Sequence, residues 1–237
     1  MCTITYLPTH KDSFILTSNR DESKVRPTFP PAIEKAGNVK LLFPKDAVAG
    51  GTWICISSKN RVACLMNGAF EKHAWNPPYR KSRGLVVLDL FQYESVDDFM
   101  NGYNFEGIEP FTLIIYDRLS MTEFRWDGKD KYSKAIDTLQ PHIWSSASLY
   151  PRAVRERREN WFRKWLEGRK KFLQDEILEF HRFGGEGDKE NDFVMNRYDI
   201  VQTVSITSIV KTPQQAAMRY HDLIDSRISE ITIEFEQ

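Results

Sequence analysis

The sequence predicts an α+β domain of layered sheets and helices, and three observations lead to this class. Strand-like runs occur in hairpin pairs, helical patterns fall between groups of these pairs, and the composition is that of an ordinary globular protein. Of the 237 residues, 41% are hydrophobic and 28% are charged, which suffices for a substantial core with a solvated surface. We expect a single domain over residues 1–237.

The chain opens with a predicted β-hairpin. Thr3–Leu7 and Ser13–Ser18 are rich in β-branched and aromatic residues, and Pro8–Asp12 between them is typical of a turn. In an antiparallel hairpin with this turn, Cys2 lies opposite the end of the second strand. The polar tetrad at residues 19–22 is therefore expected to emerge beside the Cys2 sulfur.

Further strand-like runs follow at residues 51–57, 61–66, 111–117, 121–126, 142–145, 201–210 and 228–235. Arg118–Ser120 separates two of these runs and predicts a second tight hairpin. Gly50 and Gly51 indicate a tight backbone turn before Trp53.

Helical patterns lie between these strands. Residues 81–93 carry apolar side chains at helical spacing, and Ser95 with Asp98 three positions later resembles a capping box. Thr212 followed by Pro213 predicts the start of another helix, whose buried side would carry Ala216, Ala217, Tyr220, Leu223 and Ile224. The glycine- and charge-rich residues 184–192 predict a mobile loop.

The longest helical candidate covers residues 151–180 and is basic. Nine basic and three acidic residues fall within 151–171, and Trp161, Phe162 and Trp165 form an apolar patch on the same segment. Such a helix can bind nucleic acid, acidic headgroups or the phosphates of a coenzyme. More commonly, its aromatic side chains pack on a sheet while its charges face water.

Charge and composition argue against several partners and compartments. Thirty-three basic and thirty-three acidic residues cancel, so no overall field favours nucleic acid, and no run of about 18 apolar residues predicts a membrane span. The first residues lack the features of a secretory signal, so we expect a cytoplasmic protein. Oligomeric state cannot be predicted from these features.

Metal and cofactor motifs are missing from the sequence. The five histidines form no close ligand pair, and neither a phosphate-binding loop nor a dinucleotide fingerprint occurs. We therefore expect no metal and no cofactor. Cys55 and Cys64 lie within predicted strands and are interpreted as reduced core residues.

Cys2 is the residue best suited to chemistry. If the initiator methionine is removed, Cys2 carries both a thiol and an α-amine, whose ordinary pKa values are about 8.5 and about 7.7–8.0. The amine can then act as base for the thiol, and a nearby guanidinium would favour the thiolate. The alternative is a cysteine that only packs, beside a solvated charged hairpin end.

Three motifs resemble a known family. Asn19-Arg20-Asp21-Glu22, Gly50-Gly51-Thr52-Trp53 and Leu65-Met66-Asn67-Gly68 are similar to those of the NRDE proteins, also called the transport-and-Golgi-organisation family. That family resembles N-terminal nucleophile (Ntn) hydrolases such as choloylglycine hydrolase and penicillin V acylase. The resemblance implies a four-layer αββα sandwich, with two antiparallel sheets between helix layers and Cys2 open to a cleft between the sheets.

The resemblance also implies roles for individual residues. Cys2 would be the nucleophile, Arg20 and Asp21 would hold it, and Asn67 would supply an oxyanion donor. Substrate contacts are further expected from Asn19, Trp53, Trp75 and Ser146.

Two departures from the family pattern weaken this transfer. Relatives carry Ser-Asn-Ala where this chain has Ser145-Ser146-Ala147, so a hydroxyl replaces an amide. A late arginine of the acylases has no clear counterpart, and Arg197 is a poor match.

The sequence thus predicts an N-terminal-cysteine amidohydrolase that cleaves a C–N amide bond of an unknown small acylated substrate through a thioester. The main alternative is a non-catalytic protein that binds or carries a small molecule such as a lipid or haem, because a fold does not fix a function. A third interpretation is an interaction module that uses the basic helix.

Overall fold

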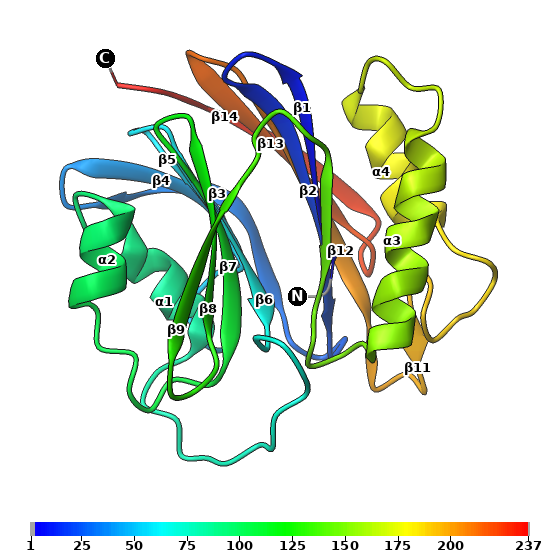
Figure 1. Ribbon diagram of the computed structural model, residues 1–237, viewed down its shortest axis with the longest axis horizontal. Helices are drawn as coiled ribbons and strands as arrows, with labels where there is room; N and C mark the ends of the chain where they lie inside the picture. Colours follow the sequence, from blue (N-terminus) through cyan, green and yellow to red (C-terminus); the bar gives the residue numbers. More distant parts are fainter. Residues whose placement is uncertain (1–2, 237) are drawn as a thin grey trace.

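The computed structural model describes residues 3–236 as two antiparallel sheets packed face to face between two pairs of helices (Figure 1). The predicted α+β class and its four-layer αββα arrangement are confirmed. Among the described residues, no helix is long and apolar enough to cross a membrane.

The first sheet contains both ends of the described chain. Its strands follow the order β10 (His142–Ser145), β1 (Thr3–His10), β2 (Ser13–Glu22), β12 (Val201–Lys211), β13 (Gln215–Asp222) and β14 (Arg227–Glu234), with β11 (Asn196–Arg197) beside β12. Helices α3 (Arg152–Leu166) and α4 (Gln174–Phe183) cover its outer face (Figure 1).

The second sheet is a meander in chain order. It runs through β3 (Thr28–Ala36), β4 (Val39–Asp46), β5 (Ile54–Ser57), β6 (Arg61–Asn67), β7 (Phe111–Asp117), β8 (Ser120–Trp126) and β9 (Lys131–Ile136). Helices α1 (Arg83–Leu90) and α2 (Val96–Gly102) lie on its outer side, with α1 against β5 and β6 (Figure 1).

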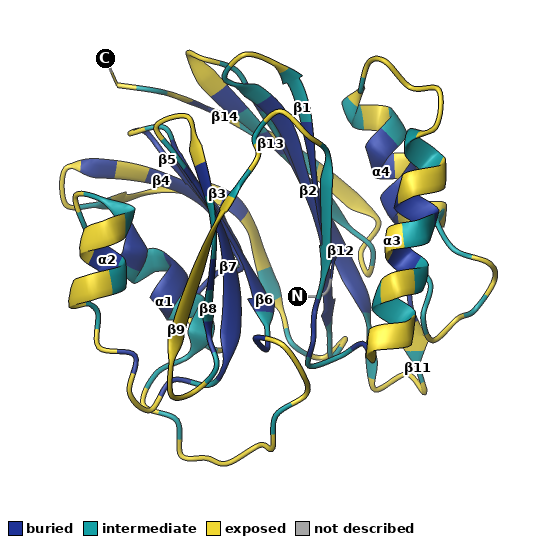
Figure 2. Cartoon of the chain, in the orientation of Figure 1, coloured by how far each residue is buried: buried dark blue, intermediate teal, exposed yellow. Residues whose placement is uncertain are grey.

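Two apolar clusters hold these layers together. The larger lies mainly between the sheets and under α1 and α2, and the smaller joins the first sheet to α3 and α4 through Leu7, Ile15, Trp161, Phe162, Ile177, Phe180 and Phe193. Figure 2 shows the same division, with buried strands at the centre and exposed residues on the outer helix faces. The aromatic residues of α3 therefore pack on the sheet.

The predicted first hairpin is confirmed, including its register. Thr3 pairs with Asn19, and Asp12 adopts a left-handed conformation in the turn, with φ of 58°. The tetrad therefore lies at the end of β2 next to the first described residue. Cys2 itself lies outside the described residues.

The helix predicted after Thr212 is wrong, because this segment forms β13. Ala216, Met218 and Tyr220 are buried at every second position, which is the period of a strand. Thr212 closes a turn instead: its Oγ1 accepts a hydrogen bond from the Gln215 N–H at 3.3 Å. The same side-chain bond that caps a helix thus ends a hairpin here.

Two helix boundaries and several strands also differ from the prediction. Residues 151–180 form two helices rather than one, separated by a connection that contains Gly168 with φ of 73°. The helix predicted at 81–93 covers only Arg83–Leu90, whereas the capping box at Ser95 is confirmed. Strands β3, β4 and β9 were not predicted, because β3 and β9 are exposed edge strands and β3 and β4 contain proline. The mobility of residues 184–192 and the single domain remain predictions.

Candidate functional site

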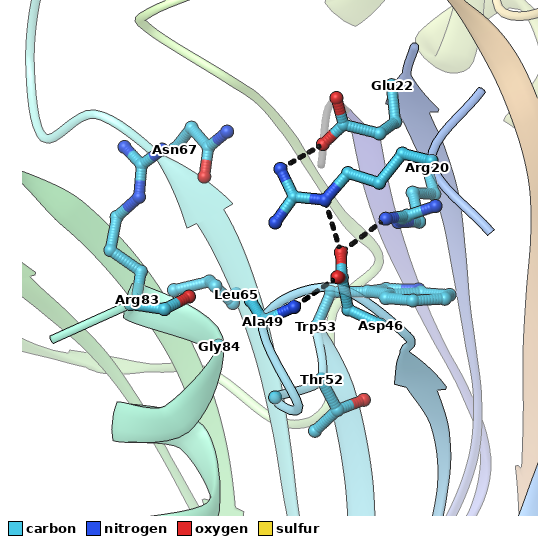
Figure 3. A pocket seen from close by; sticks show the side chains of 13 residues that line it. Arg20, Glu22, Asp46, Ala49, Thr52, Trp53, Leu65, Asn67, Arg83 and Gly84 are labelled. Atoms are coloured by element: carbon cyan, nitrogen blue, oxygen red, sulfur yellow. Dashed lines mark hydrogen bonds and ion pairs between the residues drawn. The ribbon is translucent and has the colours of Figure 1, made fainter. Parts of the chain in front are cut away.

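A small cavity of about 90 Å³ lies beside the end of β2 (Figure 3). Its lining brings together three of the residues singled out from the sequence, Arg20, Trp53 and Asn67. Glu22 and Thr52, from two of the sequence motifs, also line it, and four polar residues that were not predicted complete it: Arg26, Asp46, Ser82 and Arg83. The cavity is smaller than the usual ligand pocket of about 300–1,000 Å³, so it has room for little more than a reacting group.

Arg20 is held rigidly on one side of this cavity. Its guanidinium donates to Asp46 at 2.7 Å and to Thr28 Oγ1 at 2.9 Å, and it lies 4.6 Å from the centre of the Trp53 ring. Asp46 also pairs with Arg26 at 2.8 Å. The orientation of Arg20 is therefore fixed by a carboxylate and an aromatic face, a geometry that lysine cannot reproduce.

Asp46 is ionised and serves two purposes. Burial by itself would raise the pKa of Asp46, but hydrogen bonds from the Ala49 and Val48 N–H groups and the charges of Arg26 and Arg20 hold it below its ordinary value. These backbone bonds also fix the turn that leads to Gly50. An aspartate just before a glycine-containing turn is a signal that could have identified Asp46 from sequence.

Asn67 lies on the other side of the cavity beside Arg83, opposite Arg20 and Asp46 (Figure 3). Its main-chain carbonyl accepts a hydrogen bond from the buried Ser146 hydroxyl at 2.8 Å. Ser146 thus positions the Asn67 backbone, and its expected contact with substrate stays a prediction.

Arg83 is a cavity residue that sequence reasoning missed. It pairs with Glu109 at 3.0 Å and donates to the Pro110 carbonyl at 3.1 Å. Burial lowers the pKa of Arg83, and the charge of Glu109 opposes this shift. Nothing in its local sequence distinguishes it from other arginines.

Asp21 and Asn19 point to the opposite face of β2 from Arg20, because neighbouring side chains of a strand alternate. Asp21 accepts hydrogen bonds from the Tyr150 and Thr203 hydroxyls, both at 2.6 Å. Asn19 donates to the main-chain carbonyls of Phe193 at 2.7 Å and His181 at 3.1 Å. The family resemblance implied that Arg20 and Asp21 both hold the Cys2 nucleophile. In the structure their side chains diverge, and Asn19 anchors α4 rather than lining the cavity.

Arg158 is another residue whose position was not predicted. It contacts Thr3 at the start of β1. Its side chain is fully buried, donates to Thr3 Oγ1 and lies 3.7 Å from the centre of the Tyr150 ring. Its other donors bind the main-chain carbonyls of Asn191 and Asp192. Within residues 3–236, no carboxylate lies within ion-pair distance of this guanidinium. The sequence had suggested that the charges of this helix face water.

The two tryptophans expected to contact substrate lie in different environments. Trp53 is 3% exposed and lines the cavity beneath Arg20, whereas Trp75 is 76% exposed and is not among the lining residues. Cys55 and Cys64 are free and buried, as predicted, and burial raises the pKa of the Cys64 thiol to about 12. Neither is poised to react. The described part of the chain contains no cluster of side chains suited to a metal ion.

His181 predicts a measurable pH dependence of stability. It is fully buried between Thr5 and Asn19, and burial, followed by the charge of Arg158, lowers its pKa from 6.5 to about 3. The unfolded chain therefore binds a proton below about pH 6.5 that the folded chain does not. The free energy of unfolding is therefore highest above this pH. It should fall by about 1.5 kcal/mol between about pH 6.5 and 5.

Urea unfolding as a function of pH checks this expectation. His181→Gln should make the free energy of unfolding depend less on pH. His221 adds a smaller effect of the same sign, since burial lowers its pKa too, so His221→Gln is the matched control. An unchanged slope in His181→Gln would contradict the assignment.

Comparison with solved structures finds other proteins with this fold. A mutant of the conjugated bile acid hydrolase from Clostridium perfringens matches with a TM-score of 0.58 and 9% identity, covering 100% of this chain and 97% of that one. A Caenorhabditis elegans N-acylethanolamine-hydrolyzing acid amidase ortholog matches with a TM-score of 0.59 and 12% identity, covering 88% and 92%. At these identities the likeness shows the fold alone.

Sequence comparison identifies the family. A search of curated proteins finds no match. The family model described as Transport and Golgi organisation 2, in contrast, matches residues 1–237. The chain therefore belongs to the Transport and Golgi organisation 2 family, the NRDE family that its motifs resemble.

Proposed function

We propose that this protein is an N-terminal-cysteine amidohydrolase that cleaves a C–N amide bond of a small acylated substrate. One observation carries the proposal: Arg20, Trp53 and Asn67 line a single cavity at the end of β2, on an Ntn-hydrolase-like scaffold. Thr3, which follows Cys2 in the chain, pairs with Asn19 at that same end. These three motif residues and Thr3 thus lie near the same end of β2.

The proposed reaction has two halves. After loss of Met1, the Cys2 amine takes the thiol proton, and the sulfur attacks the amide carbonyl carbon. The C–N bond then breaks, the amine leaves with the proton, and a thioester remains. Water attacks the thioester, which releases the acid and restores the thiol.

Asn67 is the proposed electrostatic stabiliser of both tetrahedral intermediates. Its side-chain amide faces the cavity, and Ser146 fixes its backbone from behind. An oxyanion donor of this kind is worth about 2.7–4 kcal/mol of transition-state stabilisation. Arg20 would favour the thiolate, while Asp21 and Arg158 act as positioning residues through Tyr150 and Thr3.

The second candidate is a protein that binds a small molecule without turnover, such as a lipid or haem. Ser146 favours this binding protein. Its hydroxyl donates to the Asn67 carbonyl, whereas an amide side chain at this position would be free to hold substrate. The two candidates differ in whether Cys2 is a reactive amino terminus.

Covalent labelling separates the candidates. Intact-mass spectrometry after treatment with a thiol-reactive acyl probe should show Met1 removed and a single adduct on the wild type. Cys2→Ala should carry no adduct, whereas the matched control Cys55→Ala, which alters a buried cysteine, should label like the wild type. Equal labelling of wild type and Cys2→Ala would refute the amidohydrolase, and retained Met1 would favour binding.

A further inference from the structure

A second, larger cavity of about 580 Å³ lies beside the start of α3. We call it the α3 cleft; its walls are residues 71–72, 147–152 and 155 together with Glu190, Asn191 and Arg197. Figure 1 shows the start of α3 and β11 at the same end of the molecule. Its charged lining residues are Glu71, Lys72, Arg152, Arg155, Glu190 and Arg197, an excess of basic groups. At this volume the cleft can hold a small organic molecule.

Two polar atoms in the wall of the α3 cleft are buried and lack a hydrogen-bond partner among residues 3–236. They are Nε of Arg155 and Oγ of Ser148. Arg155 also forms no ion pair with any described residue. Buried polar groups are nearly always paired in folded proteins, and an unmet donor costs about 1–3 kcal/mol. Neither atom is accessible to a ligand, whereas the two terminal nitrogens of Arg155 are accessible and form no hydrogen bond with a described residue. These terminal nitrogens are the donors that the cleft offers to a ligand.

Arg197 adds a guanidinium that is already oriented. It donates to the Leu149 and Glu190 carbonyls and to Asn191 Oδ1, each at 3.0 Å, and no carboxylate of residues 3–236 pairs with it. Arginine has five N–H donors, so two remain for a ligand. Because three bonds hold the group in place, little side-chain entropy is lost on binding.

The start of α3 reinforces the same charge preference. This 15-residue helix has no side-chain cap and no acidic residue in its first turn. Its free N–H groups and its dipole therefore add positive potential beside Arg155, while Arg152 pairs with Glu156 at 2.7 Å. Three independent features of one cleft favour an anion.

We propose that the α3 cleft binds the phosphate-type oxyanion of a small molecule. A dianionic group with three acceptor oxygens can be shared by the Arg155 and Arg197 guanidinium groups, and guanidinium–phosphate bonds are among the strongest that proteins make. The Ser148 N–H also contacts the Asn67 carbonyl at 3.5 Å, so the cleft adjoins the cavity with the Asn67 main chain between them. Binding here does not depend on turnover at Cys2.

Isothermal titration with inorganic phosphate and phenyl phosphate tests the proposal, at ionic strength held constant with sodium chloride. The wild type and Cys2→Ala should bind one equivalent with equal affinity, which separates this site from the fate of the proposed hydrolase. Arg155→Gln and Arg197→Gln should each weaken binding about tenfold or more, since each loses a charge-assisted pair.

Arg163→Gln is the matched control, because it removes one positive charge from an exposed position of α3 outside the cleft. It should stay within about twofold of the wild type, as expected for a screened surface charge. The proposal is overturned if phosphate shows no saturable binding above chloride, or if Arg163→Gln and Arg155→Gln lose affinity equally. Benzoate binding as tightly as phenyl phosphate would refute the preference for phosphate.

Discussion

Arg158→Met should lower the free energy of unfolding by about 3–5 kcal/mol, as judged from the loss of several buried hydrogen bonds. The wild-type guanidinium is completely buried and donates to Thr3 Oγ1 and to the main-chain carbonyls of Asn191 and Asp192. Methionine fills similar space but leaves these acceptors without donors. Each unmet buried acceptor costs about 1–3 kcal/mol, and some relaxation reduces the sum.

Urea unfolding of Arg158→Met against Arg157→Met measures this effect. Arg157 is the next residue along α3, but its side chain is 42% exposed and pairs with the partly exposed Asp188 at 3.0 Å. An exposed ion pair contributes about 0–1 kcal/mol, so Arg157→Met should be nearly neutral. Similar losses in the two variants would show that Arg158 does not anchor the start of β1.

Arg158 also illustrates what the sequence could not predict. The basic pattern of the segment is visible, but nothing in it separates Arg158 from Arg157. Burial of one and exposure of the other depend on Asn191 and Asp192, which follow α4 and lie more than thirty positions away. Tertiary contacts between residues so far apart in the sequence leave no local sequence signal.

The first hairpin and its tetrad could be predicted because the information is local. Alternation within β1 and β2 and a short turn fix the register, so the tetrad had to lie near the start of the chain. Which tetrad side chain faces the cavity is a separate question. Alternation along β2 puts Arg20 and Asp21 on opposite faces. Predicting which of the two lines the cavity requires knowing which face of β2 packs against the second sheet.

The helix prediction for the segment after Thr212 failed for a different reason. Threonine bonded to a main-chain N–H three residues on is used both at helix starts and in turns. The apolar pattern of Ala216, Ala217 and Tyr220 fits a helix face, while Ala216, Met218 and Tyr220 fit a strand face. Pairing with β12 and β14 on both sides selects the strand.

The wall of the small cavity gives the second large prediction, that Gly51→Ala destabilises far more than Gly50→Ala. A Cβ on Gly51 would lie 2.3 Å from the Gly84 carbonyl carbon and 2.5 Å from the Leu85 nitrogen, both backbone atoms of α1. The Thr52 N–H donates to the Gly84 carbonyl at 3.0 Å, so the segment before β5 and helix α1 cannot separate without breaking this bond. Forced overpacking of this kind should cost about 3 kcal/mol or more.

Gly50 separates steric crowding from backbone strain. It has φ of 70° and open space where a Cβ would lie, whereas Gly51 lies outside the left-handed region. Alanine at Gly50 should cost only about 1–2 kcal/mol, the ordinary penalty of a left-handed L-residue. Thermal or urea unfolding of the two variants gives the comparison.

The same pair of variants reports on the proposed site, because Gly51 and Gly84 both line the cavity with Arg20 and Asn67. Moving α1 away from Gly51 shifts Arg83, which neighbours Gly84, and so reshapes the wall beside Asn67. Labelling of Cys2 should therefore slow in Gly51→Ala under conditions where it remains folded, and stay near wild type in Gly50→Ala. If Gly51→Ala is as stable as Gly50→Ala and its Cys2 is labelled as fast, then α1 can move to accommodate the added methyl group. In that case α1 does not fix the geometry of the cavity.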